Sequence, residues 1–189
     1  MGSVILGMTM SLDGFINDPG GSVARLYPDF DQLRETEQLR EAIRNTGAVV
    51  MGRHAYGMGD PDEYADNYEF QAPIFVLTHE PPQQHPREND RLTFTFVTDG
   101  IESAVAQAKA AAGDRDVTII GGASTFQQCL RAGLADELQI DIMPVLLGGG
   151  LRLFEHLGTE PIELEKIGGA ENPTPVRTAL RFRIKQRNK

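Results

Sequence analysis

Four short segments of the sequence carry the residues that could bind a nucleotide or act on a substrate. They are "TMSLDGFI" (residues 9–16), "GRHAYG" (52–57), "THE" (78–80) and "GGASTF" (121–126), and each follows an apolar run. Between them they supply glycines, hydroxyls, one arginine, two histidines and one aspartate. Arginine and histidine side chains, bare backbone and a helix start are the usual means of holding a phosphate-bearing ligand.

Gly121 and Gly122 lie where a β-branched run ends and a helical pattern begins. Without side chains, the backbone here can approach a ligand closely, and Ser124 or Thr125 can cap the helix while its N–H groups point outward. Oriented amides and the helix dipole favour a pyrophosphate at such a place. The pair fits neither G-x-G-x-x-G nor the P-loop pattern, so a simple strand-to-helix turn stays an open alternative.

A cation and a hydroxyl follow two further apolar runs. Arg53 comes directly after Gly52 and offers a planar fork of donors that suits phosphate. Thr78 and His79 could line a second phosphate or a ribose. The alternatives are an arginine held in a surface ion pair and a solvated loop histidine.

Asp13 is the candidate catalytic residue. It precedes Gly14 in a turn signature at the end of the first apolar run. If that run is a central strand, the carboxylate faces the crevice and can bind a substrate hydroxyl or amine, or relay the proton that a reduced product must collect. The alternative is an aspartate that only forms the turn.

The apolar runs before these segments predict a parallel sheet. They are rich in Val and Ile and mostly do not alternate, as in strands covered on both faces: Val4–Met8, Ala48–Met51, Ile74–Leu77 and Val117–Ile120. Helical patterns lie between them, over residues 31–47 with Gly47 as the stop, and over 99–113 with Asp99 as N-cap and Gly113 at the end. Because ligands of an open α/β sheet bind at the carboxyl ends of its strands, the four segments are expected to meet in one crevice.

The last third of the chain alternates instead. Residues 137–145 and 179–186 show apolar side chains at every second position, which predicts antiparallel strands with one wet face. The prediction is therefore an α/β fold of one domain, residues 1–189, with a mixed, mostly parallel sheet and antiparallel strands last.

Composition limits the function classes. The chain has 189 residues and a formal net charge of −9, which argues against general binding to nucleic acid or to an anionic membrane. Its one cysteine, Cys129, allows no internal disulfide and no thiol metal cluster, and its helical position predicts a core residue. The N-terminus does not fit a signal peptide, and no apolar run has the length of a membrane span, so a cytoplasmic protein is expected.

Two further segments have open interpretations. The acidic, aromatic residues 60–70 form either a lid over the substrate or a solvated loop. The glycine-rich residues 146–154 form either a bend on the substrate side, where Arg152 meets an acidic substrate, or a dimer contact.

The order of these motifs resembles a known family. "MSLDGFI", "VVMGRHAY", "VLT" and "IIGGASTF", followed by "DELQIDIMPVLLGGGLRLF", resemble the dihydrofolate reductase-like superfamily over nearly the whole chain. The sequence is most similar to stand-alone proteins that resemble the C-terminal reductase domain of bacterial bifunctional riboflavin-biosynthesis deaminase-reductases. The resemblance implies a three-layer α/β/α fold, NADPH as cofactor, a small heterocyclic or carbonyl substrate that receives hydride, and a homodimer.

The resemblance also implies roles for individual positions. Those expected to bind the cofactor are Met8 and Thr9 at the nicotinamide wall, Gly52, Arg53 and His54 on the adenosine side, Thr78 and His79 by the 2′-phosphate, and Gly121, Gly122, Ala123, Ser124, Thr125 and Phe126 along the pyrophosphate. Asp13 matches a substrate-contacting aspartate of the riboflavin-pathway reductases.

The sequence departs from the family pattern at three points. Ala55 stands where the family has a threonine, which removes a hydroxyl contact to the cofactor. His79 stands where a stronger cation is usual, so the preference for NADPH over NADH is open. The helix around Glu35, Glu37 and Glu41 does not match the catalytic acid of true dihydrofolate reductases. Two other functions stay open: a non-catalytic dinucleotide-binding protein or sensor, and an α/β domain whose glycines only form turns.

Overall fold

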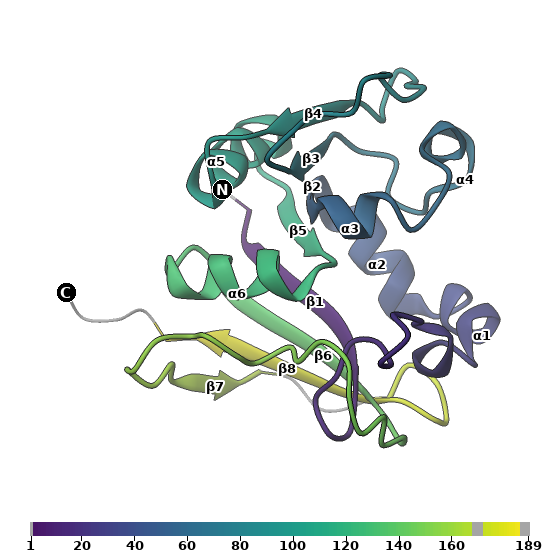
Figure 1. Ribbon diagram of the computed structural model, residues 1–189, viewed down its shortest axis with the longest axis vertical. Coiled ribbons are helices and arrows are strands. Elements are labelled where there is room, and N and C mark those ends of the chain that lie inside the picture. Colours follow the sequence, from purple (N-terminus) through teal and green to yellow (C-terminus); the bar gives the residue numbers. More distant parts are fainter. Residues whose placement is uncertain (1, 168–171, 186–189) are drawn as a thin grey trace.

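A single eight-stranded sheet organises residues 2–167 and 172–185, which are the residues that the computed structural model describes (Figure 1). Its strand order is β4-β3-β2-β5-β1-β6-β8-β7. The strands are β1 (Val4–Ser11), β2 (Thr46–Gly52), β3 (Ile74–Leu77), β4 (Phe94–Val97), β5 (Asp116–Ile120), β6 (Glu137–Met143), β7 (Leu164–Lys166) and β8 (Thr178–Ile184).

The first five strands of the sequence run parallel to all their neighbours in the sheet, as predicted for the four apolar runs among them. β1 is central, because it lies between β5 and β6. All seven residues of β2 are buried, which explains why the apolar runs do not alternate. The antiparallel strand β8 pairs with β6, and β7 adds the last strand. The expected mixed, mostly parallel sheet is therefore confirmed.

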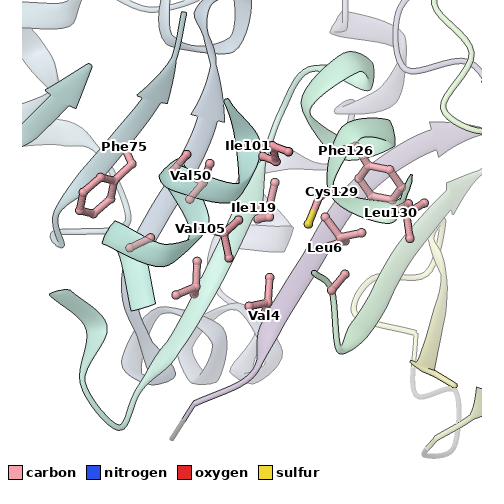
Figure 2. Close-up of a cluster of buried hydrophobic side chains, with 14 of the residues drawn as sticks. Val4, Leu6, Val50, Phe75, Ile101, Val105, Ile119, Phe126, Cys129 and Leu130 are labelled. Atoms are coloured by element: carbon pink, nitrogen blue, oxygen red, sulfur yellow. The ribbon is translucent and has the colours of Figure 1, made fainter. Parts of the chain in front are cut away.

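Helices cover both faces of the parallel part. α5 (Ile101–Ala112) and α6 (Ala123–Arg131) pack on one face against alternate residues of the inner strands, and Figure 2 shows Val4, Leu6, Val50 and Ile119 meeting side chains of these helices. The other residues of the same strands, among them Val49 and Met51, belong to a second core. The two cores follow from the period of two along a strand, which points successive side chains to opposite faces.

Tyrosines complete the second core. Tyr56 of α3 (Arg53–Tyr56) and Tyr64 of α4 (Tyr64–Asn67) pack there against Phe94 of β4. The short helix η2 (Pro61–Glu63) leads directly into α4.

The helix predicted over residues 31–47 is wrong in its extent. The chain forms two helices, α1 (Phe30–Arg34) and α2 (Glu37–Asn45), separated at Thr36, whose hydroxyl accepts a hydrogen bond from the N–H of Leu39. An N-cap of this kind starts a new helix, and the periodicity alone could not show it. Gly47 does not end the helix either, since it lies inside β2, where a Cβ would be 2.8 Å from Ala112 Cα.

Two other local predictions are corrected. The N-cap of α5 is Gly100 and not Asp99. Gly113 ends this helix, as expected, and has a positive φ of 64°. β6 was expected to be antiparallel, but it pairs parallel with β1 and antiparallel only with β8. Its side chains alternate between buried and partly exposed over most of its length. No helix among the described residues is long and apolar enough to cross a membrane.

Candidate active site

The four predicted segments follow four neighbouring strands. In sheet order the strands are β3, β2, β5 and β1, and the first three segments begin at Thr78, Gly52 and Gly121. The fourth segment, residues 9–16, begins within β1 and leaves this strand after Ser11. Because all four strands run parallel, their carboxyl ends lie at one edge of the sheet. The expected convergence of these segments follows from the topology.

The turns after β2 and β5 touch each other, and glycine allows the contact. A Cβ on Gly121 would lie 2.5 Å from the Cβ of Ala55, and a Cβ on Gly52 would lie 2.6 Å from Thr125 Oγ1. Gly121 and Gly122 both have φ near +80°, a region that other residues rarely adopt. The glycines therefore serve the packing of two turns and at the same time leave bare backbone at this edge.

Helix α6 begins at this bare backbone without a side-chain cap. Its N-cap is Gly122, so the prediction that Ser124 or Thr125 caps the helix is wrong. Ser124 is exposed and its hydroxyl accepts a bond from Gln128, while Thr125 is buried against the glycines. The first backbone N–H groups of the helix, among them that of Ala123, can thus donate to other hydrogen-bond acceptors.

The side chain of Phe126 is part of the core. It is fully buried (Figure 2). Its ring packs edge-on against that of Phe154. Its role at a pyrophosphate site is thus limited to its backbone.

Arg53 is tied to the segment after β3. Its Nη1 donates to the carbonyl oxygen of Glu80 over 2.9 Å, and Thr78 Oγ1 donates to the same carbonyl over 2.8 Å. Arg53, His54 and His79 are exposed, and Arg53 has no carboxylate partner among the described residues. The surface ion pair that was the alternative for Arg53 is not formed there, so its charge stays available in an acidic chain.

Aromatic packing fixes the short helix that carries Arg53 and His54. Tyr56, at the end of α3, stacks on Tyr64, whose hydroxyl donates to the backbone oxygen of Tyr56 over 3.0 Å. Burial raises the pKa of Tyr64 to about 12. Residues 60–70 are therefore not a solvated loop, because they include η2 and α4 and because Tyr64 and Ala65 are buried. That they form a lid over the substrate stays a prediction.

Asp13 links the end of β1 to the loop after β6. Its Oδ1 accepts hydrogen bonds from Ser11 Oγ at 2.6 Å and from the N–H of Leu147, and its Oδ2 accepts one from the N–H of Gly148. The Ser11 hydroxyl, followed by these backbone N–H groups, lowers the pKa of Asp13 to about 2. The side chain is thus a carboxylate near neutral pH and acts there as an acceptor and not as a proton donor.

Further bonds join the same two loops into one rim, defined as residues 12–17 and 145–153. They run from Leu12 N to Val145 O, from Ile16 N to Leu151 O, from Leu153 N to Gly14 O and from Leu151 N to Asn17 Oδ1. Arg152 lies with its guanidinium carbon 4.5 Å from the centre of the Phe15 ring and 3.5 Å from a Glu155 carboxylate oxygen in its ion pair. The glycine-rich segment is thus a fixed wall, and Arg152 is already engaged.

Met8 and Thr9 point to opposite faces of β1. Met8 packs against the core under α6, whereas Thr9 is buried on the other face and accepts a hydrogen bond from Arg177 Nη1 at 3.0 Å. The nicotinamide wall predicted at these positions therefore has a buried polar group behind it.

The polar residues behind this wall form a cluster around Arg177. The sequence did not predict this cluster. The Arg177 side chain is completely buried and forms a bidentate pair with Asp29, with both bonds at 2.8 Å. Thr174 Oγ1 donates to Asp29, and the guanidinium lies over the ring of Tyr27. Burial acts to raise the pKa of Asp29, but the hydrogen bonds from Arg177 and Thr174 outweigh it and the pKa is lowered. The sequence around Arg177 gives no sign that this side chain is buried, because Arg177 precedes a strand in which apolar and charged residues alternate.

Asp141 is the partly exposed member of this cluster. It lies opposite Thr9 in the β1–β6 register, its Oδ2 is 3.4 Å from Arg177 Nη1, and its side chain is 27% exposed. Burial raises the pKa of Asp141 more than Arg177 lowers it. The carboxylate faces a hollow of about 140 Å³ between α2 and the strands β6 and β8.

The other titratable side chains offer less. Glu35 and Glu37 form exposed ion pairs with Arg40 and Arg44. Cys129 is buried, as predicted, and burial raises its pKa to about 12. Among the described residues no three His, Cys, Asp or Glu side chains are grouped so as to hold a metal ion.

Comparisons with known proteins agree with this architecture. A structure of a candidate riboflavin biosynthesis protein from Shewanella sp. PV-4 superposes with a TM-score of 0.77 at 24% identity, covering 97% of this chain and 99% of that one. The diaminohydroxyphosphoribosylaminopyrimidine deaminase/5-amino-6-(5-phosphoribosylamino)uracil reductase of Thermotoga maritima gives 0.68 at 16% identity, with 97% and 57% covered. Among curated proteins, the uncharacterized protein YyaP of Bacillus subtilis is 26% identical over 158 residues, which is 80% of this chain and 79% of YyaP.

The sheet order and the crowded carboxyl edge define the dihydrofolate reductase-like fold of the riboflavin-pathway reductases, as expected. The model of the RibD C-terminal domain matches residues 2–171. The chain belongs to the RibD C-terminal domain family.

Proposed function

We propose that this protein is an NADPH-dependent reductase that delivers hydride to a small heterocyclic or carbonyl substrate. One observation carries the proposal: the uncapped start of α6, with Gly121 and Gly122 at positive φ, lies beside the turn that presents Arg53. A helix N-terminus and bare amides suit a pyrophosphate, and a guanidinium whose charge is not neutralised by a carboxylate suits a further phosphate. Family membership supports the same conclusion.

The residues present fit a dinucleotide at two points. The first amides of α6 would hold the pyrophosphate, since their N–H groups have no side-chain cap. Arg53 would bind the 2′-phosphate, with His54 and His79 beside it on the same edge. The bond from Arg53 to Glu80 O holds the guanidinium in place before the ligand arrives, which lowers the entropy cost of binding.

The substrate side lies at the other end of the edge, where the rim and β1 meet. NADPH supplies the hydride when it is bound, and the protein orients the acceptor and limits the access of water. Asp13 would accept a hydrogen bond from a substrate hydroxyl or amine with the lone pairs that Ser11, Leu147 and Gly148 leave over. Its lowered pKa fits binding and not proton donation.

Calorimetric titration with NADPH, and with NADH in parallel, tests the proposal. We expect saturable binding of NADPH and at least tenfold weaker binding of NADH. A tenfold difference in affinity corresponds to the loss of about one hydrogen bond to a charged group. Absence of binding for both would leave the glycines as packing turns alone. Binding of NADPH without turnover on pterins, pyrimidines, quinones and dicarbonyls would favour the non-catalytic dinucleotide-binding protein or sensor.

A homodimer is part of the same proposal. β7 lies at the edge of the sheet and all three of its residues are exposed, so its outer backbone groups offer a second copy a strand to pair with. Analytical ultracentrifugation gives the oligomeric state directly.

A further inference from the structure

Gln127 of α6 joins this helix to the rim. Its Nε2 donates to the carbonyl oxygens of Arg152 over 3.0 Å and of Leu153 over 3.1 Å. Gln127 is only 8% exposed, and its amide nitrogen carries two hydrogens, so both of its donors are used inside the protein. Within the part of the chain that the structure describes, no other side chain of α6 hydrogen-bonds to residues 12–17 or 145–153.

The two carbonyl groups belong to residues that pair with the loop after β1. Arg152 forms an isolated antiparallel bridge with Phe15, and the N–H of Leu153 donates to the carbonyl oxygen of Gly14 over 3.0 Å. Gly14 directly follows Asp13, which borders the candidate substrate side. The glutamine amide of α6 is therefore separated from the Asp13 turn only by Leu153, which is hydrogen-bonded on both sides.

Two other contacts of α6 with this segment lie beyond the rim. Phe126 packs edge-on against Phe154, and Arg131 Nη1 donates to the carbonyl oxygen of His156 over 3.0 Å. Among the described residues, neither Phe154 nor His156 forms a backbone hydrogen bond to the loop after β1. These contacts hold the end of the segment, whereas Gln127 holds the part that pairs with the loop.

The other end of this connection is the first turn of α6. The helix has no side-chain cap, and its first N–H groups, beginning at Ala123, are those assigned to the pyrophosphate. Gln127 lies about one helical turn after Ala123. Because uncapped helix ends fray and an anion at the N-terminus stabilises the first turn, a ligand there changes the order of the turn that leads to Gln127.

We propose that Gln127 is a positioning residue that couples occupancy of the α6 start to the order of the rim. The pyrophosphate of the cofactor then stiffens the wall of the substrate side, and the inference rests on the proposed dinucleotide site at α6. Because coupling between two sites is reciprocal, a ligand held by the rim raises the affinity of the α6 start by the same factor.

The test uses 2′-phosphoadenosine 5′-diphosphoribose as the probe, which is NADPH without its nicotinamide. The probe carries the pyrophosphate but has no ring to place at Met8 and Thr9, so an effect on the rim cannot come from the nicotinamide. The readout is hydrogen exchange of the rim N–H groups of Ile16, Gly148 and Leu153, each of which is hydrogen-bonded within the rim. In the wild type, saturating probe is expected to slow this exchange about fivefold or more, the lower end of usual coupling between sites.

One variant removes the connection. Gln127→Met keeps the length of the side chain and removes both donors, so the probe should change rim exchange by no more than about twofold while it still binds. The matched control is Gln107→Met, which alters an exposed glutamine of α5 that donates to Ser103 Oγ, and it should respond as the wild type does. The ratio of exchange with and without probe is taken within each protein. A merely structural role would lower stability in both states and leave this ratio unchanged.

A second measurement does not depend on the variant, which leaves two carbonyl groups without their donor and could fail to fold. In the wild type, the side-chain amide hydrogens of Gln127 are followed directly by NMR. They are expected to exchange more slowly in the presence of the probe, by a factor similar to that of the rim. A rim that responds while the Gln127 amide does not would overturn the inference.

The outcomes separate this inference from the reductase proposal. If the probe and NADPH bind but rim exchange does not respond, or responds equally in wild type and Gln127→Met, the inference is overturned and the cofactor proposal stands. If neither the probe nor NADPH binds, the cofactor proposal fails and the inference fails with it.

Discussion

Asp13 accepts a hydrogen bond from the backbone N–H of Gly148 at 2.8 Å, across 135 residues of sequence. With the bonds from Ser11 and Leu147 it closes the loop after β1 onto the loop after β6. An aspartate that looks like an ordinary turn residue in the sequence thus ties together the two loops that border the candidate substrate side.

Replacing Asp13 by Asn is expected to lower turnover with little change in NADPH affinity, because the rim borders the substrate and not the cofactor. Steady-state kinetics and NADPH titration of D13N measure the two effects separately. Asn17→Asp, which also alters a rim contact (to Leu151 N) but changes the charge in the opposite sense, is the comparison variant. An unchanged rate in D13N would show that Asp13 only forms the turn.

The lowered pKa of Asp13 has a defined pH signature. Because its folded-state pKa, about 2, lies below its usual value of 3.8, the ionised carboxylate stabilises the fold above pH 3.8, and this contribution is lost as pH falls from about 4 to about 2. The difference in melting temperature between wild type and D13N should be constant above about pH 5 and shrink towards pH 2. A difference that grows on acidification would contradict the assignment.

Arg53→Ala is expected to weaken NADPH binding about tenfold or more and NADH binding little, because the guanidinium is assigned to the phosphate that only NADPH carries. Titration calorimetry with both nucleotides measures this. Arg40→Ala, an exposed arginine of α2, controls for the change in net charge. Equal losses for both nucleotides would remove the 2′-phosphate role and leave cofactor binding intact.

Comparing Gly121→Ala with Gly133→Ala separates the cost of a positive φ from the cost of a steric clash. Gly121 and Gly133 both have positive φ, 79° and 65°, but an added Cβ meets Ala55 at Gly121 and nothing within 4 Å at Gly133. Gly133→Ala should cost about 1–2 kcal/mol in the free energy of unfolding. Gly121→Ala should cost about 1–3 kcal/mol more through overpacking and should also weaken NADPH binding. Urea unfolding of both variants gives the comparison, and equal costs would mean that the two turns do not pack.

Arg177→Met is expected to destabilise the fold by about 3–5 kcal/mol, because it leaves the buried carboxylate of Asp29 without its partner. Arg183→Met breaks an exposed pair with Glu165 and should cost less than about 1 kcal/mol. Chemical denaturation measures both. A small loss for Arg177→Met would show that Asp29 finds other donors or takes up a proton.

Much of the fold could be predicted, since the information is local. The unbroken Val and Ile runs indicated strands buried on both faces, and the residues after them could be assigned to one edge once the strands were taken as parallel. The helix around Thr36 could not be predicted in the same way. The break between α1 and α2 depends on the N-cap hydroxyl of Thr36, whereas the apolar periodicity of the sequence continues across the break.

The polar cluster could not be predicted because its partners are far apart in the sequence. Arg177 lies 148 residues from Asp29 and 168 from Thr9, and nothing in its neighbours distinguishes it from the arginines of β8, which are exposed or partly exposed. In the sequence, Asp141 likewise looks like a solvent-facing residue of a strand in which apolar and polar residues alternate. Only the register of β1 and β6 shows that it shares a face with Thr9.

The central position of β1 has a consequence for synthesis of the chain. β1 is made first, but its two neighbours are β5, which begins at Asp116, and β6, which begins at Glu137. Over one hundred residues must therefore emerge from the ribosome before either edge of β1 is paired, and until then it presents unpaired backbone to other chains. The strand that carries Thr9 and leads into Asp13 thus cannot take up its final place until most of the chain has been made, so the site assembles late.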